Sequence, residues 1–206
     1  WDRDIDRMVA RTAGRPLASG ALRPIQALWF LAALLAIGLS VLLQLNPLCW
    51  VLGVGSLVLV GVYPLMKRIT WWPQAFLGLT FNWGALMGWA AVTGSLFDVS
   101  DRPAWLLYLA GFFWTLGYDT IYAHQDREDD ALVGIRSSAL RMGERVQGGV
   151  GLFYLAAMAL WLGAFWMLRP DWVALLALVP MGLHLLWQVA TLDVANADNT
   201  LARFRS

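Results

Sequence analysis

Residues 24–66 read PIQALWFLAALLAIGLSVLLQLNPLCWVLGVGSLVLVGVYPLM, a run of 43 positions without a charged side chain. A transmembrane helix needs about 20 consecutive apolar residues, so this run is long enough for two crossings. Asn46-Pro47 interrupts the run, because proline lacks the backbone N–H that a helix interior requires. The stretch therefore predicts two membrane-spanning helices, at about 24–45 and 48–66.

Four further charge-poor runs lie downstream, separated by charged segments. They occupy residues 69–97, 103–123, 146–168 and 172–192. In lipid every backbone polar group must be satisfied inside the segment, which favours helices. The sequence therefore predicts an all-α, multi-pass transmembrane helix bundle with six spans, and we expect residues 1–206 to form a single domain.

The composition agrees with a membrane protein. The chain has 206 residues, of which 59% are hydrophobic and 14% are charged, whereas a soluble domain carries about 25% charged residues. The net charge is +1, and no basic stripe lies outside the loops, which excludes a nucleic-acid-binding protein. The one cysteine, Cys49, excludes an internal disulfide.

Neither end of the chain has the features of a natural terminus. The chain begins at Trp1 rather than Met and ends in a basic segment, Arg203-Phe204-Arg205-Ser206, which we expect to be a loop. We therefore expect the sequence to be the middle of a longer protein, incomplete at both ends.

Basic residues are distributed unevenly between the two sides of the predicted membrane. With six crossings, 13 of the 15 basic residues fall on one side, and only Arg102 and Arg169 fall on the other. The residues of the richer side are Arg3, Arg7, Arg11, Arg15, Arg23, Lys67, Arg68, Arg127, Arg136, Arg141, Arg145, Arg203 and Arg205. By the positive-inside rule, that side faces the cytoplasm of a bacterium or the matrix of a mitochondrion.

Two acidic clusters lie on this basic side, and they share one spacing. Asp2 and Asp6 are four residues apart, and so are Asp126 and Asp130. On a helix this spacing puts two carboxylates on one face, where their repulsion costs roughly 0.2–0.5 kcal/mol per pair. A bound divalent cation removes that cost, and carboxylate oxygens are the ligands that Mg²⁺ prefers. One such cluster alone could be a helix cap or a solvated loop, but two on one side predict a Mg²⁺–diphosphate clamp.

The other acidic residues of the clusters are Asp4, Glu128 and Asp129, which are either further ligands or solvated neighbours. Cations on the same side are available for the remaining diphosphate oxygens, since arginine offers forked donors to phosphate. The candidates are Arg11, Arg15 and Lys67. We interpret Arg23, Arg141 and Arg145 as ordinary positive-inside flanks.

A few polar residues lie inside the apolar runs, where an ionisable group is costly and points inward. Asp119 is near the basic-side end of its span, and Asn82 is in the middle of another. Together with Tyr63 and Tyr122 they are the candidates for catalysis or acceptor binding. The alternatives are an interfacial carboxylate that reaches water for Asp119 and an interhelical hydrogen bond for Asn82.

At these residues the chain resembles the membrane-embedded UbiA-type prenyltransferase superfamily. Asp2 and Asp6 match the last two aspartates of its Asn-Asp-x-x-Asp-x-x-x-Asp motif, whose first two positions precede Trp1. Residues 63–67 match its Tyr-x-x-x-Lys motif, and residues 118–130 match its second aspartate motif. The segment 72–84 resembles the branch that acts on 4-hydroxybenzoate.

The resemblance implies a nine-helix bundle, with two spans before Trp1 and one after Ser206. It also implies an enzyme of ubiquinone biosynthesis that uses Mg²⁺, takes polyprenyl diphosphate as donor and prenylates 4-hydroxybenzoate ortho to its hydroxyl. The membrane would be a bacterial or mitochondrial inner membrane, with the active site on the cytoplasmic or matrix side.

Two other functions are compatible with parts of the sequence. Another branch of the superfamily would act on a naphthoate, haem or chlorophyll acceptor, and the segment 72–84 argues against it. A cation transporter would place carboxylates near the middle of the bilayer, whereas here they cluster at one face.

Overall fold

The computed structural model describes residues 3–8, 12–125, 127, 132, 134 and 136–206, with the backbone alone at Ile5 and Lys67. Every regular element in this part of the chain is helical. The helices are α1 (Arg3–Asp6), α2 (Pro24–Leu42), α3 (Pro47–Ile69), α4 (Pro73–Phe81), α5 (Trp83–Thr93), η1 (Val99–Asp101), α6 (Arg102–Ala123), α8 (Ser138–Met142), η2 (Gly143–Arg145), α9 (Val146–Leu168), α10 (Trp172–Leu176), α11 (Val179–Ala190) and α12 (Ala197–Arg205).

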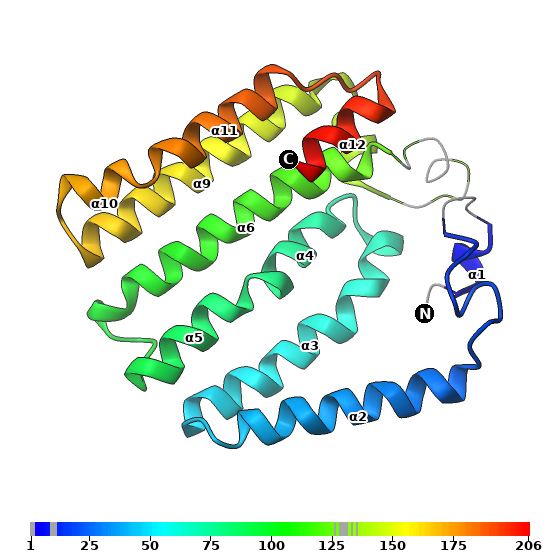
Figure 1. The fold of residues 1–206 in the computed structure, drawn as a ribbon, viewed down its shortest axis with the longest axis horizontal. Coiled ribbons are helices and arrows are strands. Elements are labelled where there is room, and N and C mark those ends of the chain that lie inside the picture. Colours follow the sequence, from blue (N-terminus) through cyan, green and yellow to red (C-terminus); the bar gives the residue numbers. More distant parts are fainter. Residues whose placement is uncertain (1–2, 9–11, 126, 128–131, 133, 135) are drawn as a thin grey trace.

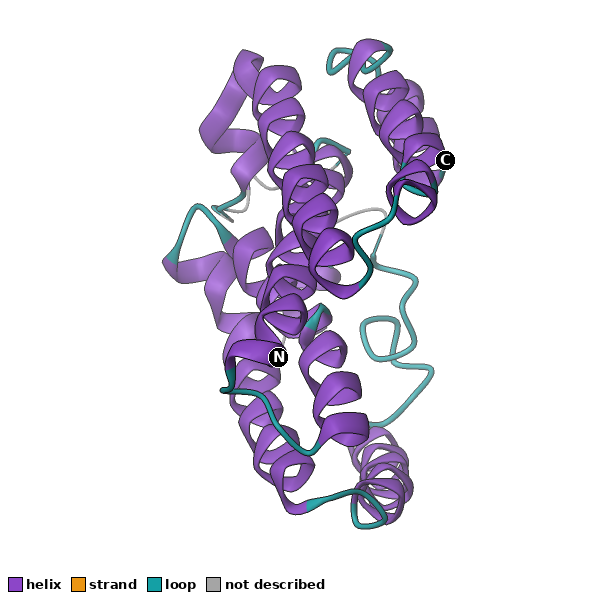
Figure 2. Ribbon diagram, turned by 90° about the vertical axis from the view of Figure 1, so that its left-hand side faces the viewer, coloured by secondary structure: helices purple, strands orange, loops and turns teal. Residues whose placement is uncertain are grey.

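The long helices run back and forth past one another, so the chain forms a bundle whose loops collect at two opposite ends (Figure 1). Five helical segments in the described residues are long and apolar enough to cross a membrane. They are Pro24–Leu42, Pro47–Met66, Pro73–Thr93, Ser138–Leu168 and Trp172–Ala190. The predicted all-α transmembrane bundle is confirmed, and Figure 2 shows helices joined by loops in the described part of the chain.

The span predicted at 103–123 differs from the others. It forms α6, a helix of 22 residues, which is long enough to cross but is not among the five apolar segments. Figure 1 shows the reason, since α6 runs through the middle of the bundle between α4–α5 and α9. A helix covered by other helices needs a less apolar surface than a helix covered by lipid.

Two of the predicted spans are broken rather than continuous. The segment predicted at 69–97 divides at Asn82, whose side chain donates a hydrogen bond to the carbonyl of Gly78 at 2.9 Å and thereby competes with the helical backbone pattern. The segment predicted at 172–192 divides between α10 and α11, just before Pro180, which cannot donate to the preceding turn.

The break predicted at Asn46-Pro47 is confirmed. Pro47 is the first residue of α3, where its missing N–H would have no acceptor in any case. Asn46 caps the helix, because its side-chain oxygen accepts from the Cys49 N–H at 3.1 Å. Its amide nitrogen donates to the carbonyl of Ala90 in α5 at 2.7 Å, which joins two neighbouring helices at the end opposite the acidic segments.

The packing around α6 depends on close approach at glycines. A Cβ on Gly117 would lie 2.4 Å from the ring of Tyr154 in α9, and a Cβ on Gly111 would lie 2.2 Å from the side-chain oxygen of Asn82. Small residues at such contacts let helices in a membrane approach closely enough for van der Waals attraction to hold them together. One face of α6 therefore packs closely on α9 at Gly117, and another packs closely on Asn82, between α4 and α5, at Gly111.

The C-terminal segment differs from the predicted basic loop. Residues 197–205 form α12, whose N-terminus is capped by Asn196 through a 3.1 Å hydrogen bond from the Asn199 N–H. Polar side chains dominate this helix, so apolar periodicity does not reveal it. The Gln188 side chain in α11 donates to the carbonyl of Arg203 at 2.8 Å and holds α12 against the bundle.

We predict that Gly117→Leu lowers the thermal unfolding temperature of the protein in detergent. The new side chain has no room beside Tyr154, and overpacking of this kind typically costs about 1–3 kcal/mol. Scanning calorimetry or fluorimetry measures the change. Gly38→Leu in α2 is the matched control, because no atom lies within 4 Å of a Cβ there, and it should leave the unfolding temperature unchanged. Equal behaviour of the two variants would contradict the packing role of Gly117.

Candidate active site

One end of the bundle collects the segments that carry the predicted site. Figure 1 shows α1, the end of α3, the end of α6, α8 and α12 at the same end. The basic residues of the richer side that the structure describes lie in these segments or beside them, whereas Arg102 and Arg169 lie at the opposite end. The fold therefore brings segments from the beginning, middle and end of the sequence together on one face.

In the first acidic cluster, Asp6 differs from Asp4. The Asp6 carboxylate accepts a hydrogen bond from the Arg15 guanidinium at 2.9 Å, and its side chain is only 18% exposed. Asp4 is 73% exposed and pairs with Arg3 and Arg7, and the hydrogen bond from Arg3 lowers its pKa below the ordinary value. Asp4 could be a further metal ligand or a solvated neighbour, and its exposure favours the solvated neighbour. Asp6 instead contacts Arg15, which is a predicted diphosphate-binding residue.

Most of the predicted clamp lies outside the described residues. This applies to Asp2, Asp126, Asp130 and Arg11, and also to Glu128 and Asp129. In the part of the chain that the structure does describe, no group of three metal-ligating side chains occurs. The carboxylate clamp stays a prediction from the sequence.

The Tyr63–Lys67 motif occupies the last two turns of α3. Tyr63 is half-buried, and Lys67 follows it by about one turn, so both lie on the same side of the helix. The carbonyl of Ile69, which ends α3, accepts a hydrogen bond from the Arg136 guanidinium at 2.6 Å. Arg136 also lies 5.5 Å from the Trp71 ring centroid, in cation–π geometry. The segment that follows the second acidic cluster is thus fastened to the helix that carries Tyr63 and Lys67.

A buried polar network fixes the start of α8. The hydroxyls of Thr120 in α6 and Ser138 are 2.7 Å apart, and the Ser138 N–H donates to the Gln74 side chain in α4 at 3.1 Å. All three residues are buried. These residues were not predicted from the sequence, where their one signal is that they are polar side chains near the ends of apolar runs. They position the exit from the loop that contains the second cluster.

Asp119 and Tyr122 lie in the last turns of α6. Tyr122 packs on Phe204 of α12 with the ring centroids 4.5 Å apart, and Tyr118 lies 6.0 Å from the same ring. Asp119 is half-buried between these tyrosines in the sequence. The end of α6 therefore presents a carboxylate and aromatic faces together, just before the second aspartate cluster begins.

Asn82 lies deeper in the bundle, about 14 Å along α4 from its first residue. Its amide nitrogen donates to the Thr115 hydroxyl of α6 at 2.8 Å and to the Gly78 carbonyl at 2.9 Å. Both amide hydrogens are thereby used inside the protein. The structure thus shows the interhelical hydrogen bond that was the alternative interpretation of Asn82. A role of Asn82 in binding the acceptor substrate stays a prediction.

His124 is the C-cap residue of α6 and lies two residues before the second cluster begins. Its side chain is buried, and burial together with the positive charge of Arg127 lowers its pKa below the ordinary value. Among the described residues, its Nε2 atom has no hydrogen-bond partner. A neutral imidazole is therefore the favoured form at this position.

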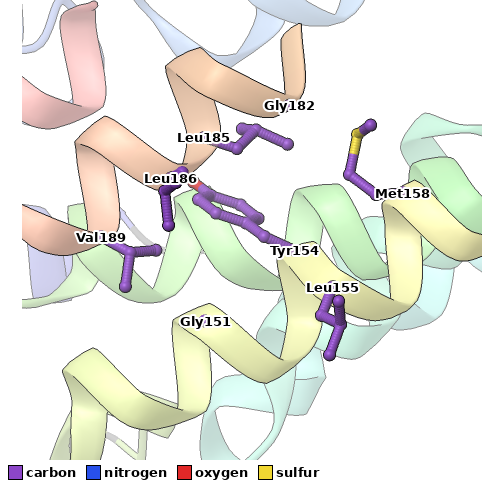
Figure 3. A pocket seen from close by; sticks show the side chains of 8 residues that line it. All are labelled: Gly151, Tyr154, Leu155, Met158, Gly182, Leu185, Leu186 and Val189. Atoms are coloured by element: carbon purple, nitrogen blue, oxygen red, sulfur yellow. The ribbon is translucent and has the colours of Figure 1, made fainter. Parts of the chain in front are cut away.

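Two cavities are lined by residues of α11. One of about 310 Å³ lies between α6, α11 and α12 and is lined by Trp114, Tyr118, His184, Gln188 and Phe204. The other, of about 170 Å³, lies between α9 and α11 and is lined by Tyr154 and aliphatic side chains (Figure 3). The first combines aromatic faces with a few polar groups, which suits an apolar substrate with a polar end.

Comparison with known proteins covers the whole chain. The sequence pattern of the UbiA prenyltransferase family matches residues 1–206. The chain is 46% identical over 209 residues to a Rattus norvegicus protein named "4-hydroxybenzoate polyprenyltransferase, mitochondrial", covering 100% of this chain and 54% of that protein. The Arabidopsis thaliana protein of the same name is 47% identical over 205 residues, covering 100% of this chain and 50% of that protein. The chain spans about half the length of these curated relatives.

A solved structure has the same fold. The apo structure of a UbiA homologue from Aeropyrum pernix K1 superposes with a TM-score of 0.83 at 26% sequence identity, covering 99% of this chain and 75% of that chain. The helix arrangement described above is therefore similar to that of this homologue.

We predict that Gln74→Ala destabilises the protein by about 1–3 kcal/mol, because the buried Ser138 N–H loses its acceptor. The measurement is the thermal unfolding temperature in detergent. Gln44→Ala at the opposite end is the control, since Gln44 is exposed and bonds only the Ser40 carbonyl, and its effect should stay within about 0.5 kcal/mol. A Gln74 variant as stable as the control would contradict the proposed role of this network in positioning the loop.

Proposed function

The chain belongs to the UbiA prenyltransferase family, and from this premise we propose that it transfers a polyprenyl group from polyprenyl diphosphate to 4-hydroxybenzoate. The new bond forms at the ring carbon ortho to the hydroxyl, and the pathway is ubiquinone biosynthesis. The names of the relatives that share 46–47% of its residues support this substrate pair. The observation that carries the proposal is that Arg136, just after the second aspartate motif, is bonded to the end of the helix that bears Tyr63 and Lys67.

The proposed metal site consists of Asp2, Asp6, Asp126 and Asp130. Asp6 is the member that the structure describes, and its poorly exposed carboxylate at the basic end of the bundle is the donor type that suits Mg²⁺. When bound, Mg²⁺ would supply positive charge to the diphosphate leaving group. The residues and the cofactor therefore fit each other chemically.

Arg11, Arg15 and Lys67 would hold the remaining diphosphate oxygens. In the structure Arg15 bonds the Asp6 carboxylate, so its guanidinium already lies at the proposed metal site and can turn one edge to phosphate. Lys67 lies at the end of α3, where the Ile69 carbonyl accepts a hydrogen bond from Arg136, six residues beyond the second cluster. Together these residues position the donor with its diphosphate at the basic end and its tail in the bundle.

When the bond to diphosphate breaks, the donor becomes an allylic cation that water would destroy. The aromatic side chains Trp114, Tyr118 and Phe204 line the cavity beside the end of α6, and such faces attract positive charge while excluding water. The ring carbon of 4-hydroxybenzoate attacks the cation, and the ring then loses a proton. The products are prenylated 4-hydroxybenzoate, diphosphate and that proton.

Asp119 is proposed to accept the hydrogen bond of the phenol or the released proton, with Tyr122 beside it on α6. Tyr63 and Asn82 complete the proposed acceptor set. The long helices make the chain an integral membrane protein. We further propose a bacterial or mitochondrial inner membrane, with the active site on the cytoplasmic or matrix side, where 13 basic residues gather.

We predict that the full-length protein in membranes makes prenylated product from 4-hydroxybenzoate and polyprenyl diphosphate only with a divalent cation. Asp126→Ala and Asp130→Ala should each lower turnover by about 100-fold or more while the protein still inserts. Asp198→Ala, an exposed carboxylate of α12, is the control and should retain activity. Full activity of an Asp126 variant in excess EDTA would rule out the clamp.

A second prediction separates the acceptor role of Asp119 from the metal site. In Asp119→Asn, product formation should fall by about 100-fold, the usual contribution of a positioned base. Donor ionisation, measured as released diphosphate or prenyl alcohol, should continue. If both fall equally, Asp119 belongs with the metal site, and unchanged product formation would assign it a structural role.

A further inference from the structure

A third cavity opens at the basic end of the bundle, and none of the residues that line it is among those proposed above for catalysis. Its volume is about 640 Å³, within the usual range for small-molecule sites. It lies between the start of α4, the α8–η2 segment and the start of α9. Its lining includes Trp72, Arg141, Arg145, Gly148, Gly149 and Leu152. We refer to it as the arginine cavity.

The two arginines give this cavity its charge. Arg141 lies in the last turn of the short helix α8 and Arg145 immediately precedes α9, and both residues line one space. Neither has a carboxylate within ion-pair distance among the residues that the structure describes, although Glu144 is adjacent in the sequence. The positive-inside rule explains why Arg141 and Arg145 lie on this side of the membrane. It does not explain why both of them line the same cavity.

Part of the cavity floor is open backbone, at Gly148, whereas the Met142 side chain, which also lines the cavity, covers Gly149. No atom lies within 4 Å of a Cβ built on Gly148, so the start of α9 presents empty space there. The first turn of α9 contains no acidic residue and no side chain caps it, although Glu144 lies two residues before its start. The N-terminal end of a helix carries a partial positive charge. This adds to the attraction that the two guanidinium groups exert on an anion.

The rim of the cavity is apolar on one side. Leu152 is 67% exposed, and Trp72 packs edge-on against Phe153 with the ring centroids 6.2 Å apart. Tryptophan is enriched at the level of lipid headgroups. Charge at one end and an exposed aliphatic and aromatic wall beside it match a molecule with an anionic head and hydrocarbon chains.

The arginine cavity lies on a different face of the bundle from the cavity beside Tyr118. α8 is bonded to α6 through Thr120, which is two residues beyond Tyr118 and therefore on roughly the opposite side of the helix. The substrate cavity proposed above is lined by Tyr118 and Trp114. An occupant of the arginine cavity would therefore contact α4, α8 and α9 without displacing either substrate.

We propose that the arginine cavity binds the phosphate of an anionic phospholipid from the leaflet on the basic side. Arg141 and Arg145 hold the phosphate oxygens, and the acyl chains lie along Leu152 and Trp72. Basic pockets between membrane helices on this side are the usual place for acidic lipid headgroups. The lipid would hold α4, α8 and α9 together.

The test is native mass spectrometry of the full-length protein with phosphatidylglycerol or cardiolipin, and with phosphatidylcholine as the zwitterionic comparison. We expect the unmodified protein to retain the anionic lipids preferentially. Arg141→Gln/Arg145→Gln should weaken that retention by about tenfold or more, because two charge-assisted contacts are lost. Gly148→Leu should weaken it as well while both charges remain, because its side chain fills the open floor.

The matched control is Arg23→Gln/Arg205→Gln, which removes the same charge from the same end of the bundle outside the cavity. It should keep the retention of anionic lipid, since at physiological salt charges beyond about 8 Å are largely screened. If the control loses as much anionic lipid as the cavity variant, the retention depends on general surface charge, and the proposal is overturned.

Two further outcomes would also overturn it. Displacement of the lipid by inorganic diphosphate, with a raised Michaelis constant for polyprenyl diphosphate in the Arg141/Arg145 variant, would assign the cavity to the donor. Equal retention of phosphatidylcholine and phosphatidylglycerol by the unmodified protein would leave only an apolar groove. Preferential anionic binding that both Arg141→Gln/Arg145→Gln and Gly148→Leu abolish supports the assignment.

Discussion

The close approach of helices to α6 is the constraint on which the rest of the structure depends. Within lipid, helices gain nothing from hydrophobic burial against one another, so van der Waals contact and interhelical hydrogen bonds must hold the bundle together. Gly117 admits the Tyr154 ring, and Gly111 admits the Asn82 side chain, which bonds Thr115 at 2.8 Å. These contacts fix α6 between its neighbours and determine where its last turn points.

The position of α6 determines the geometry of the site. Its end presents Asp119 and Tyr122 and leads directly into the second aspartate motif. The chain returns through Arg136, bonded to the end of α3, and through Ser138, bonded to Gln74 and to Thr120. A loop held at both ends in this way can carry several like charges close together, because the repulsion is opposed by bonds outside the cluster. The proposed clamp therefore relies on residues that take no part in the proposed chemistry, namely Arg136 and the buried polar residues around Ser138.

The same arrangement separates two kinds of anion site. Arg15 pairs with Asp6 at 2.9 Å, which ties that cation to the carboxylates of the proposed active site. Arg141 and Arg145 border the arginine cavity, on another face and beside an apolar wall. The uneven charge of the loops does not distinguish these arginines, but their neighbours in the fold do. Arg15 lies beside a carboxylate, whereas Arg141 and Arg145 lie beside lipid-facing side chains.

The sequence alone determined the helical spans from Pro24 to Met66, the break at Asn46-Pro47, the one-sided charge and the family motifs, because each depends on residues close together in the chain. It did not predict the break at Asn82, the placement of α6 in the centre or the short helix α12. These depend on partners far away in the sequence, such as Thr115 for Asn82, Tyr154 for Gly117 and Gln188 for α12. It likewise interpreted Arg141 and Arg145 as ordinary flanks, since only the packing of α4 against α8 and α9 forms the cavity between them. Local patterns specify which segments become helices, and tertiary contacts decide which side chains meet.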